Sequence, residues 1–286
     1  MSGPLLAVDG PFILYRSFHA LPKSIADAEG RPVNALLGAT NLLLRVVADR
    51  APRAVIVCFG AEAAAYRVEL YPGYHADRPP PPEALARQFD VAPELFAAFG
   101  WASESSEALE ADDVMHSLAQ VEERAGGRAL IMTGDRDLYQ SATDGVTVLY
   151  LRMGGRGVED VDPTEVERRY GVPPALVPDF IALRGDPSDG LPGAPGIGAK
   201  TAADLLRRHG SLEAAIDAAA GERPRVAAAL RDHAAELRGF LDIARLRAVE
   251  VDRPADRTTD LVSGAEGARR HGMRKLAERL ASGDDG

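Results

Sequence analysis

Three short, uninterrupted apolar runs restrict the fold more than any other feature of this sequence. They are residues 5–8, followed by Asp9-Gly10, residues 55–59, followed by Gly60, and residues 129–132, followed by Thr133-Gly134-Asp135. Runs of this length between helical patterns are typical of strands buried on both faces of a parallel sheet. Two of these runs are followed by an aspartate just past the end of the strand. This is the edge of the sheet where ligands bind in open α/β folds.

Helical patterns fill most of the remaining chain. One helix is predicted over residues 35–48, another over 114–124, and residues 146–150 fit a fourth strand. From residue 163 onward the pattern is helical throughout, with helices predicted over residues 163–170, 174–183, 200–209, 212–219, 225–247 and 265–281. We therefore predict an α/β domain over residues 1–178 and a helical domain over residues 179–286.

Composition places few limits on function. The 286 residues allow about two domains, and the hydrophobic share of 46% is that of an ordinary globular protein. The single cysteine, Cys58, cannot form an internal disulfide, and no targeting or membrane-spanning stretch is present, so we expect a cytoplasmic protein without membrane contact. The net charge of -10 argues mildly against nucleic-acid binding, but clustered acids supply most of it and bound metal would neutralise part.

Eight acidic residues fall into four short clusters. They are Asp9, then Glu110, Asp112 and Asp113, then Asp135 and Asp137, then Asp186 and Asp189. Taken by itself, the second cluster is explained by helix capping. The third and fourth clusters, each taken by itself, are explained by polar turns. Their joint occurrence at element ends favours divalent metal, because Mg²⁺ and Mn²⁺ prefer hard oxygen ligands. Two such ions about 4 Å apart can support hydrolysis at phosphorus.

A glycine turn follows the last acidic cluster. Gly196 and Gly198 expose backbone N–H groups before a helix that begins near Lys200 and Thr201, which suits a phosphate. The turn lacks the spacing of a P-loop, and a simple glycine-rich helix start would also explain it. The six histidines have no zinc-ligand spacing, and no serine-nucleophile motif is present.

Together these motifs resemble the bacterial 5′-nuclease family, the 5′→3′ exonucleases and flap endonucleases that include the N-terminal domain of DNA polymerase I. The resemblance runs from Asp9 to about residue 248. It rests on Asp9-Gly10, residues 14–22, residues 66–74, Glu110-Ala111-Asp112-Asp113, residues 133–138, residues 185–189 and residues 191–202.

The resemblance implies a PIN-like parallel sheet flanked by helices, with a C-terminal helix-three-turn-helix domain. By similarity, Asp9, Glu110 and Asp112 serve a first metal, while Asp135, Asp137, Asp186 and Asp189 serve a second, with Asp113 in support. Residues 66–100 would form an arch over the active site, with Arg67, Tyr74 and Arg78 at its base. Gly196, Gly198, Lys200 and Thr201 would hold duplex DNA, in some members of the family with a potassium ion.

Two departures from the family pattern concern the first metal and the scissile phosphate. An aspartate usually follows the second strand, where this chain has Gly60, and a lysine usually follows the tyrosine, where it has His75. Glu62 is a candidate replacement for the missing carboxylate, although an exposed helix acid is the simpler interpretation.

We therefore predict a 5′-3′ exonuclease or flap endonuclease that uses Mg²⁺ or Mn²⁺, with two ions, on DNA with a 5′ flap or 5′ end. The predicted catalytic residues are Asp9, Arg67, His75, Glu110, Asp112, Asp135, Asp137 and Asp189. We expect a monomer that acts beside replication or repair proteins. Two alternatives stay open: a structure-specific DNA-binding protein with a weakened catalytic centre, which Gly60 and His75 favour, and a PIN-type ribonuclease.

Overall fold

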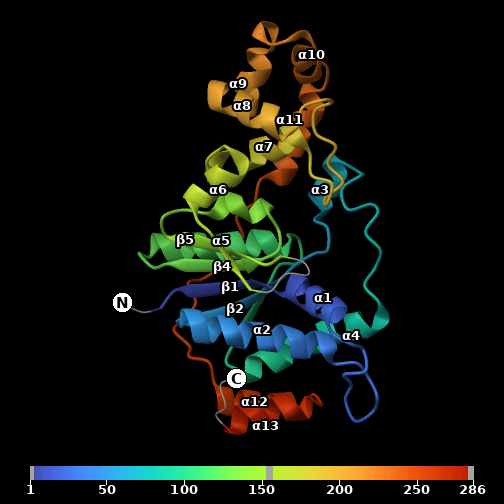
Figure 1. The fold of residues 1–286 in the computed structure, drawn as a ribbon, viewed down its shortest axis with the longest axis vertical. Helices are drawn as coiled ribbons and strands as arrows, with labels where there is room; N and C mark the ends of the chain where they lie inside the picture. Colours follow the sequence, from blue (N-terminus) through green and yellow to red (C-terminus); the bar gives the residue numbers. More distant parts are fainter. Residues whose placement is uncertain (1–2, 153–156, 283–286) are drawn as a thin grey trace.

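The computed structural model describes residues 3–152 and 157–282, and its centre is a six-stranded sheet (Figure 1). The strand order is β3-β2-β1-β4-β5-β6. The strands are β1 (Leu5–Asp9), β2 (Ala54–Phe59), β3 (Ala102–Ser105), β4 (Ala129–Thr133), β5 (Val146–Tyr150) and β6 (Glu159–Val161). All neighbouring pairs are parallel except β5 and β6, which are antiparallel. The predicted largely parallel α/β sheet is confirmed.

The sheet reverses its direction of growth at β1. The chain proceeds from β1 to β2 and β3 on one side, then returns to place β4 on the other side of β1. The carboxyl ends of β1 and β4 therefore flank a topological switch point, where open α/β sheets form their ligand crevice. Asp9 ends β1 and Thr133 ends β4, so two of the predicted clusters meet there.

Helices cover both faces of the sheet, as expected for strands without a polar face. Leu6 and Val8 of β1 pack with α1 (Gly10–Ala20), α2 (Asn34–Arg50) and α4 (Glu83–Ala98) on one side. Leu5 and Ala7, which point to the opposite face, pack with α5 (Ala111–Arg124). The alternation along β1 thus divides the core into two layers.

Most later helices form a body at one end of the molecule (Figure 1). They are α6 (Pro163–Tyr170), α7 (Val177–Arg184), α8 (Ala199–His209), α9 (Leu212–Asp217), α10 (Pro224–Asp232) and α11 (Ala234–Ala244). The short α3 (Ala65–Leu70) contacts α11. The domain boundary expected near residue 178 falls inside α7.

The chain then returns along the α/β part to the opposite end, where α12 (Leu261–Arg270) and α13 (Arg274–Ser282) pack beside α4 (Figure 1). Arg53 holds this return segment, since its guanidinium donates to Glu122 within the core and to the Pro254 carbonyl and the Asp256 carboxylate at 2.7 Å. Among the helices of residues 3–152 and 157–282, none has both the length and the apolarity needed to cross a bilayer.

Two helix predictions were wrong. The helix expected over residues 225–247 divides into α10 and α11 because His233 leaves the helical conformation, with φ -112° and ψ 15°. The helix expected over 265–281 is two helices, α12 and α13, because Gly272 between them has φ +78°. Strands β3 and β6 were not predicted.

Candidate metal centre

Asp9 connects the two strands at the switch point. Its Oδ1 accepts the Phe12 N–H at 2.9 Å and so caps α1, while its Oδ2 accepts the Thr133 hydroxyl at 2.8 Å. Burial raises the pKa of Asp9, and these hydrogen bonds and the positive charge of Arg78 only partly oppose that rise.

Glu110 and Asp113 are fully engaged at the start of α5. Glu110 accepts the Ala64 N–H at 2.8 Å and the Tyr74 hydroxyl at 2.9 Å. Asp113, which has no exposed surface, accepts the Glu110 N–H at 3.1 Å and the Arg247 N–H at 2.7 Å. The capping interpretation therefore describes Asp113 well, because its side chain and that of Glu110 form a capping box.

Arg67 lies between these two acids. Its guanidinium contacts Glu110 at 2.9 Å and Asp113 at 3.1 Å, and its Nε donates to the Ile243 carbonyl at 3.1 Å. Only 3% of Arg67 is exposed. In this arrangement Arg67 positions Glu110 and Asp113, whereas Arg78 is exposed and acts electrostatically on Asp9.

Asp112 differs from both of its acidic neighbours. In the described part of the chain, its carboxylate has no hydrogen-bond or ion-pair partner. Burial, followed by the negative charges of Asp135, Asp9 and Glu110, raises the pKa of Asp112 well above the ordinary value. A carboxylate that meets mainly other carboxylates is stabilised only by protons or by a cation.

The loop after β4 places two more carboxylates, Asp135 and Asp137, within electrostatic range of Asp112. Burial and the charge of Asp189 raise the pKa of Asp135 to about 7. Burial and the charges of Asp135 and Asp189 raise the pKa of Asp137 well above its ordinary value. The Asp135 carboxylate also accepts the Asp137 N–H at 2.9 Å, which is the polar-turn hydrogen bond that the sequence allows.

Asp186 and Asp189 come from the turn after α7. Asp186 accepts the Ser188 N–H at 2.8 Å and an Arg184 guanidinium N–H at 3.2 Å. Asp189 is buried and faces His75, with 3.1 Å between its Oδ1 and the histidine Nε2. Both aspartates contribute to the raised pKa of Asp135, so the turn lies within the same electrostatic site.

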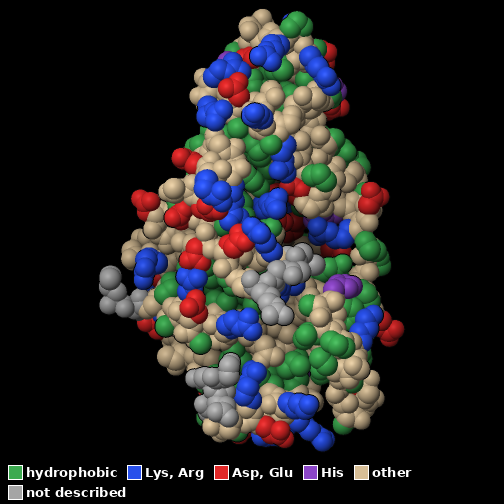
Figure 2. Space-filling model, in the orientation of Figure 1, with side chains coloured by type: hydrophobic (Ala, Val, Ile, Leu, Met, Phe, Trp, Pro, Cys, Tyr) green, Lys and Arg blue, Asp and Glu red, His purple; other side chains and the backbone are tan. Residues whose placement is uncertain are grey.

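The structure thus brings the predicted acids to one crevice from four segments of the chain. Figure 2 shows acidic side chains in a recess near the middle of one face, with Lys and Arg side chains around it. Within residues 3–152 and 157–282, no group of three or more His, Cys, Asp or Glu side chains is arranged to hold a metal directly. Hydrated magnesium suits such a site, since it keeps several waters and needs only one or two carboxylates.

His75 occupies a constrained position beside the acids. It has φ +54°, stacks on the Tyr74 ring with centroids 4.0 Å apart, and places Nδ1 3.1 Å from the Glu62 carbonyl oxygen. Glu62 itself is exposed and meets this region through its backbone carbonyl. Its side chain is not placed in the centre as a substitute for the missing carboxylate.

Gly60 is closely packed where the resemblance leads us to expect an aspartate. A Cβ at this position would lie 2.5 Å from the Ala111 nitrogen and 2.6 Å from the Leu109 oxygen. These are backbone atoms at the start of α5, so any larger residue must displace the segment that carries Glu110 and Asp112. This close approach comes from tertiary packing, and no sequence pattern reveals it.

The glycine turn lies with α8 in the helical body, away from the strand ends (Figure 1). Gly196 has φ +77° and Gly198 is the N-cap of α8, with Lys200 and Thr201 in the first turn. Gly196, Gly198 and Lys200 are exposed. Arg225 of α10 approaches this turn, so close that a Cβ at Gly196 would lie 2.7 Å from its Nε. Sequence reasoning missed Arg225 because it belongs to another helix.

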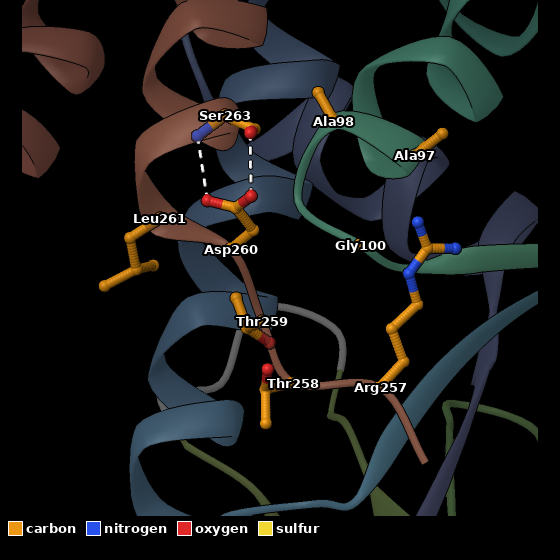
Figure 3. Close-up of a pocket in the computed structure, with 9 residues that line it drawn as sticks. All are labelled: Ala97, Ala98, Gly100, Arg257, Thr258, Thr259, Asp260, Leu261 and Ser263. Carbon is orange, nitrogen blue, oxygen red and sulfur yellow. Dashed lines mark hydrogen bonds between the residues drawn. The ribbon is translucent and has the colours of Figure 1, made fainter. Parts of the chain in front are cut away.

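A cavity of about 680 Å³ lies elsewhere, between the end of α4 and residues 257–263 (Figure 3). Its acidic residue, Asp260, caps α12 and accepts the Ser263 N–H at 2.9 Å. This cavity is therefore not part of the acidic crevice.

Gly60→Asp is expected to disrupt the centre instead of restoring a ligand. The new Cβ would displace the start of α5, and overpacking of this kind costs about 1–3 kcal/mol. Thermal unfolding should show a lower Tm for Gly60→Asp and for Gly60→Ala. Gly239→Asp is the matched control, because a Cβ there meets nothing within 4 Å. An unchanged Tm with increased metal affinity in Gly60→Asp would contradict this prediction.

The raised pKa of Asp135 predicts a pH-dependent effect of metal on stability. A carboxyl whose pKa rises to about 7 on folding adds stability below about pH 4, and that stability is lost as pH rises through 7. Mn²⁺ or Mg²⁺ should therefore raise the Tm by more degrees at pH 8 than at pH 5.5. In chelator at pH 8, Asp135→Asn should unfold at a higher temperature than the wild type, unlike the exposed control Asp232→Asn. Equal metal-induced shifts at both pH values would refute the prediction.

Comparison with known protein families accounts for nearly the whole chain. Residues 4–171 match the model of the 5′-3′ exonuclease N-terminal resolvase-like domain, and residues 172–262 match the 5′-3′ exonuclease C-terminal SAM fold. The fold is similar to that of the T5 D15 protein co-crystallised with metal ions (TM-score 0.70, 16% identity, 99% of this chain and 100% of that one). It also resembles the catalytic core of Rad2 in complex with DNA substrate (TM-score 0.63, 15% identity, 98% and 93%).

Curated relatives of similar sequence include two mycobacterial proteins. DNA polymerase I of Mycobacterium bovis is 39% identical over 245 residues, which cover 84% of this chain and 27% of the polymerase. The matched part of this chain thus corresponds to about a quarter of the length of such a polymerase. A 5′-3′ exonuclease of Mycobacterium tuberculosis is 38% identical over 280 residues, covering 91% of this chain and 87% of the relative. Since both family models match in order along one fold, the chain belongs to the 5′-3′ exonuclease family.

Proposed function

We propose that this protein is a divalent-metal-dependent nuclease that hydrolyses DNA phosphodiester bonds near 5′ ends or 5′ flaps. The observation that carries the proposal is the mutual repulsion of Asp112, Asp135 and Asp137 at the switch point of the sheet. Such a group is costly in the absence of a cation, and Mg²⁺ or Mn²⁺ fits its oxygen donors.

The acids divide into two sets by their positions. Asp9, Glu110 and Asp112, from β1 and α5, would hold one ion, and Asp135, Asp137, Asp186 and Asp189 would hold the other. When bound, two such ions activate water and stabilise the leaving oxygen of an in-line displacement at phosphorus. Arg67 and Asp113 fix the conformation of Glu110, since all three share the buried network at the start of α5.

Basic groups near the crevice would bind the substrate. Arg78 is exposed and close enough to Asp9 to lower its pKa, so it can orient a phosphate next to the metals. His75 would provide a further donor if it released Asp189. Tyr74 contributes indirectly, because its hydroxyl donates to Glu110. The arch over this site would be shorter than the expected residues 66–100, because α4 packs with α1 and α2 on one face of the sheet. Only the residues before α4 would span the crevice.

The glycine turn would hold the duplex part of the substrate. Gly196 and Gly198 are exposed before α8, and Lys200 and Thr201 begin it, an arrangement that suits a DNA phosphate and allows a potassium ion on backbone carbonyls. Solved structures of similar fold include complexes of Rad2 with DNA substrate and of T5 D15 flap endonuclease with DNA and metal ions. We further propose that the protein is a cytoplasmic monomer that acts with replication or repair proteins.

A DNA-binding protein with a weakened catalytic centre is the second candidate. The close packing of Gly60 against α5 leaves no space for the expected ligand, and His75 is bound to Asp189. Both features lower the expected occupancy of the metal centre. The unpartnered carboxylate of Asp112 argues against this candidate, because it has no evident structural use.

Cleavage of a labelled 5′-flap DNA duplex tests the two candidates directly. We expect cutting in Mg²⁺ or Mn²⁺, none in chelator, and a loss of at least about a hundredfold in Asp135→Ala, the scale of one lost electrostatic contact in a transition state. Asp232→Ala is the control for a distant aspartate. Tight binding without cleavage in any metal would favour the DNA-binding candidate. Equal or faster cutting of a matched RNA flap would favour a ribonuclease.

Metal preference provides a separate prediction. Because Gly60 removes one expected ligand, the centre formed by Asp9, Glu110 and Asp112 should bind metal more weakly than the other. Activity should therefore be higher in Mn²⁺ than in Mg²⁺, since Mn²⁺ generally binds a given donor set more tightly than Mg²⁺. Calorimetric titration of the wild type should resolve one tight and one weak site. Two sites of equal affinity would contradict the expectation.

A further inference from the structure

A second polar pocket, of about 340 Å³, lies at the end of the molecule opposite α8. It forms between the loop after α1, the first half of α4 and the turn that joins α12 to α13. Its basic lining residues are Arg31, Arg87, Arg269, Arg270, His271 and Arg274. Two carboxylates, Asp27 and Glu29, line it as well. Five arginines against two acids are unusual for a chain whose net charge is -10. Figure 2 shows basic side chains gathered at this end.

The arginines of this pocket fall into two groups. Arg31 contacts Asp27 and Glu29, both at 2.8 Å, and Arg87 donates to the Pro32 carbonyl at 2.5 Å. Arg269, Arg270 and Arg274 have no carboxylate partner within the described ranges, and all three are exposed. The pocket therefore presents uncompensated guanidinium groups, which match the geometry of a phosphate.

His271 adds a buried polar atom without a partner. Its Nε2 has no hydrogen bond among the described residues, and the nearest carboxylate oxygen, on Glu94, is 3.7 Å away. That separation exceeds a hydrogen bond. Burial lowers the pKa of His271, which leaves a neutral ring able to donate to or accept from a ligand. A buried polar group without a protein partner is usually satisfied by an ordered water or an ion.

Helix α1 connects this pocket with the acidic crevice. The helix is capped by Asp9, extends for about 16 Å over its 11 residues, and ends at Ala20, before the loop that lines the pocket. Its outer face carries Tyr15, which is 46% exposed, and His19, with ring centroids 4.5 Å apart. Exposed Lys23 follows. Aromatic rings interleaved with basic groups form the usual surface for single-stranded nucleic acid.

We propose that this pocket binds a backbone phosphate of the single-stranded 5′ arm of the substrate, beyond the point of cleavage. The inference rests on the proposed function. The turn proposed to hold the duplex lies at the other end of the molecule, which leaves this pocket to the single-stranded part of the substrate. The family models end at residue 262, so α13 and most of α12 lie beyond the segments they match.

Binding of DNA with arms of two lengths, measured by fluorescence anisotropy in chelator, tests the proposal. The variant Arg270→Ala/Arg274→Ala should bind a duplex with a long 5′ arm roughly tenfold more weakly, as expected for lost charged hydrogen bonds. Its salt slope for that substrate should fall by about 1.4, the value for two phosphate contacts on a single strand. Affinity for the same duplex with a one-nucleotide arm should not change. Lys275→Ala/Arg279→Ala removes the same charge from α13 outside the pocket and should bind both substrates as the wild type does.

Three results would overturn the proposal. If the Arg270→Ala/Arg274→Ala variant bound the long-arm and short-arm substrates equally more weakly, the arginines would contact the duplex. If it bound both substrates as tightly as the wild type, the pocket would not contact the DNA. Calorimetric binding of inorganic phosphate that the variant loses, without any dependence on arm length, would assign the site to a free anion. Failure of the proposed function itself is distinguishable: the wild type would then neither bind nor cut the one-nucleotide-arm substrate, and both ideas would be rejected.

Discussion

Carboxylates repel one another at the carboxyl ends of β1 and β4. The hydrogen bonds and ion pairs around them stabilise some of these acids and leave others without a partner. The sheet reverses its growth at β1, so the loops after these two strands are directed into the same crevice. Asp9 and Thr133 bridge the crevice by a hydrogen bond, while Asp135 and Asp137 face Asp189 across it. Burial removes the water that would otherwise screen these charges, which is why their pKa values rise together.

The protein satisfies some of these acids internally and leaves others open. Glu110 and Asp113 are held by the buried guanidinium of Arg67 and by hydrogen bonds from backbone N–H groups. Asp112, between them in sequence, points elsewhere and meets other carboxylates instead. The start of α5 therefore combines two hydrogen-bonded acids with a third whose carboxylate stays available for a cation. The buried residues that follow in α5, Val114, Met115 and Leu118, anchor this turn in the core.

Much of this arrangement could be predicted from the sequence, because buried parallel strands appear as uninterrupted apolar runs and the acids follow them. Strand β3 could not be found in this way: it lies at the sheet edge, and Ser103, Glu104 and Ser105 are exposed. The helix breaks at His233 and Gly272 depend on local dihedral angles that apolar periodicity does not encode. The engagement of Arg67 with two acids was also hidden, since its partners are distant in sequence.

The packing of Gly60 has a consequence for how such a sequence can vary. A glycine that touches the backbone of Leu109 and Ala111 allows that segment to settle closer to β2 than any larger residue would permit. A larger side chain at position 60 therefore requires a second, coordinated change in the turn before α5. Single substitutions are then all unfavourable. A further carboxylate for the metal centre can therefore come more easily from another part of the crevice than from position 60.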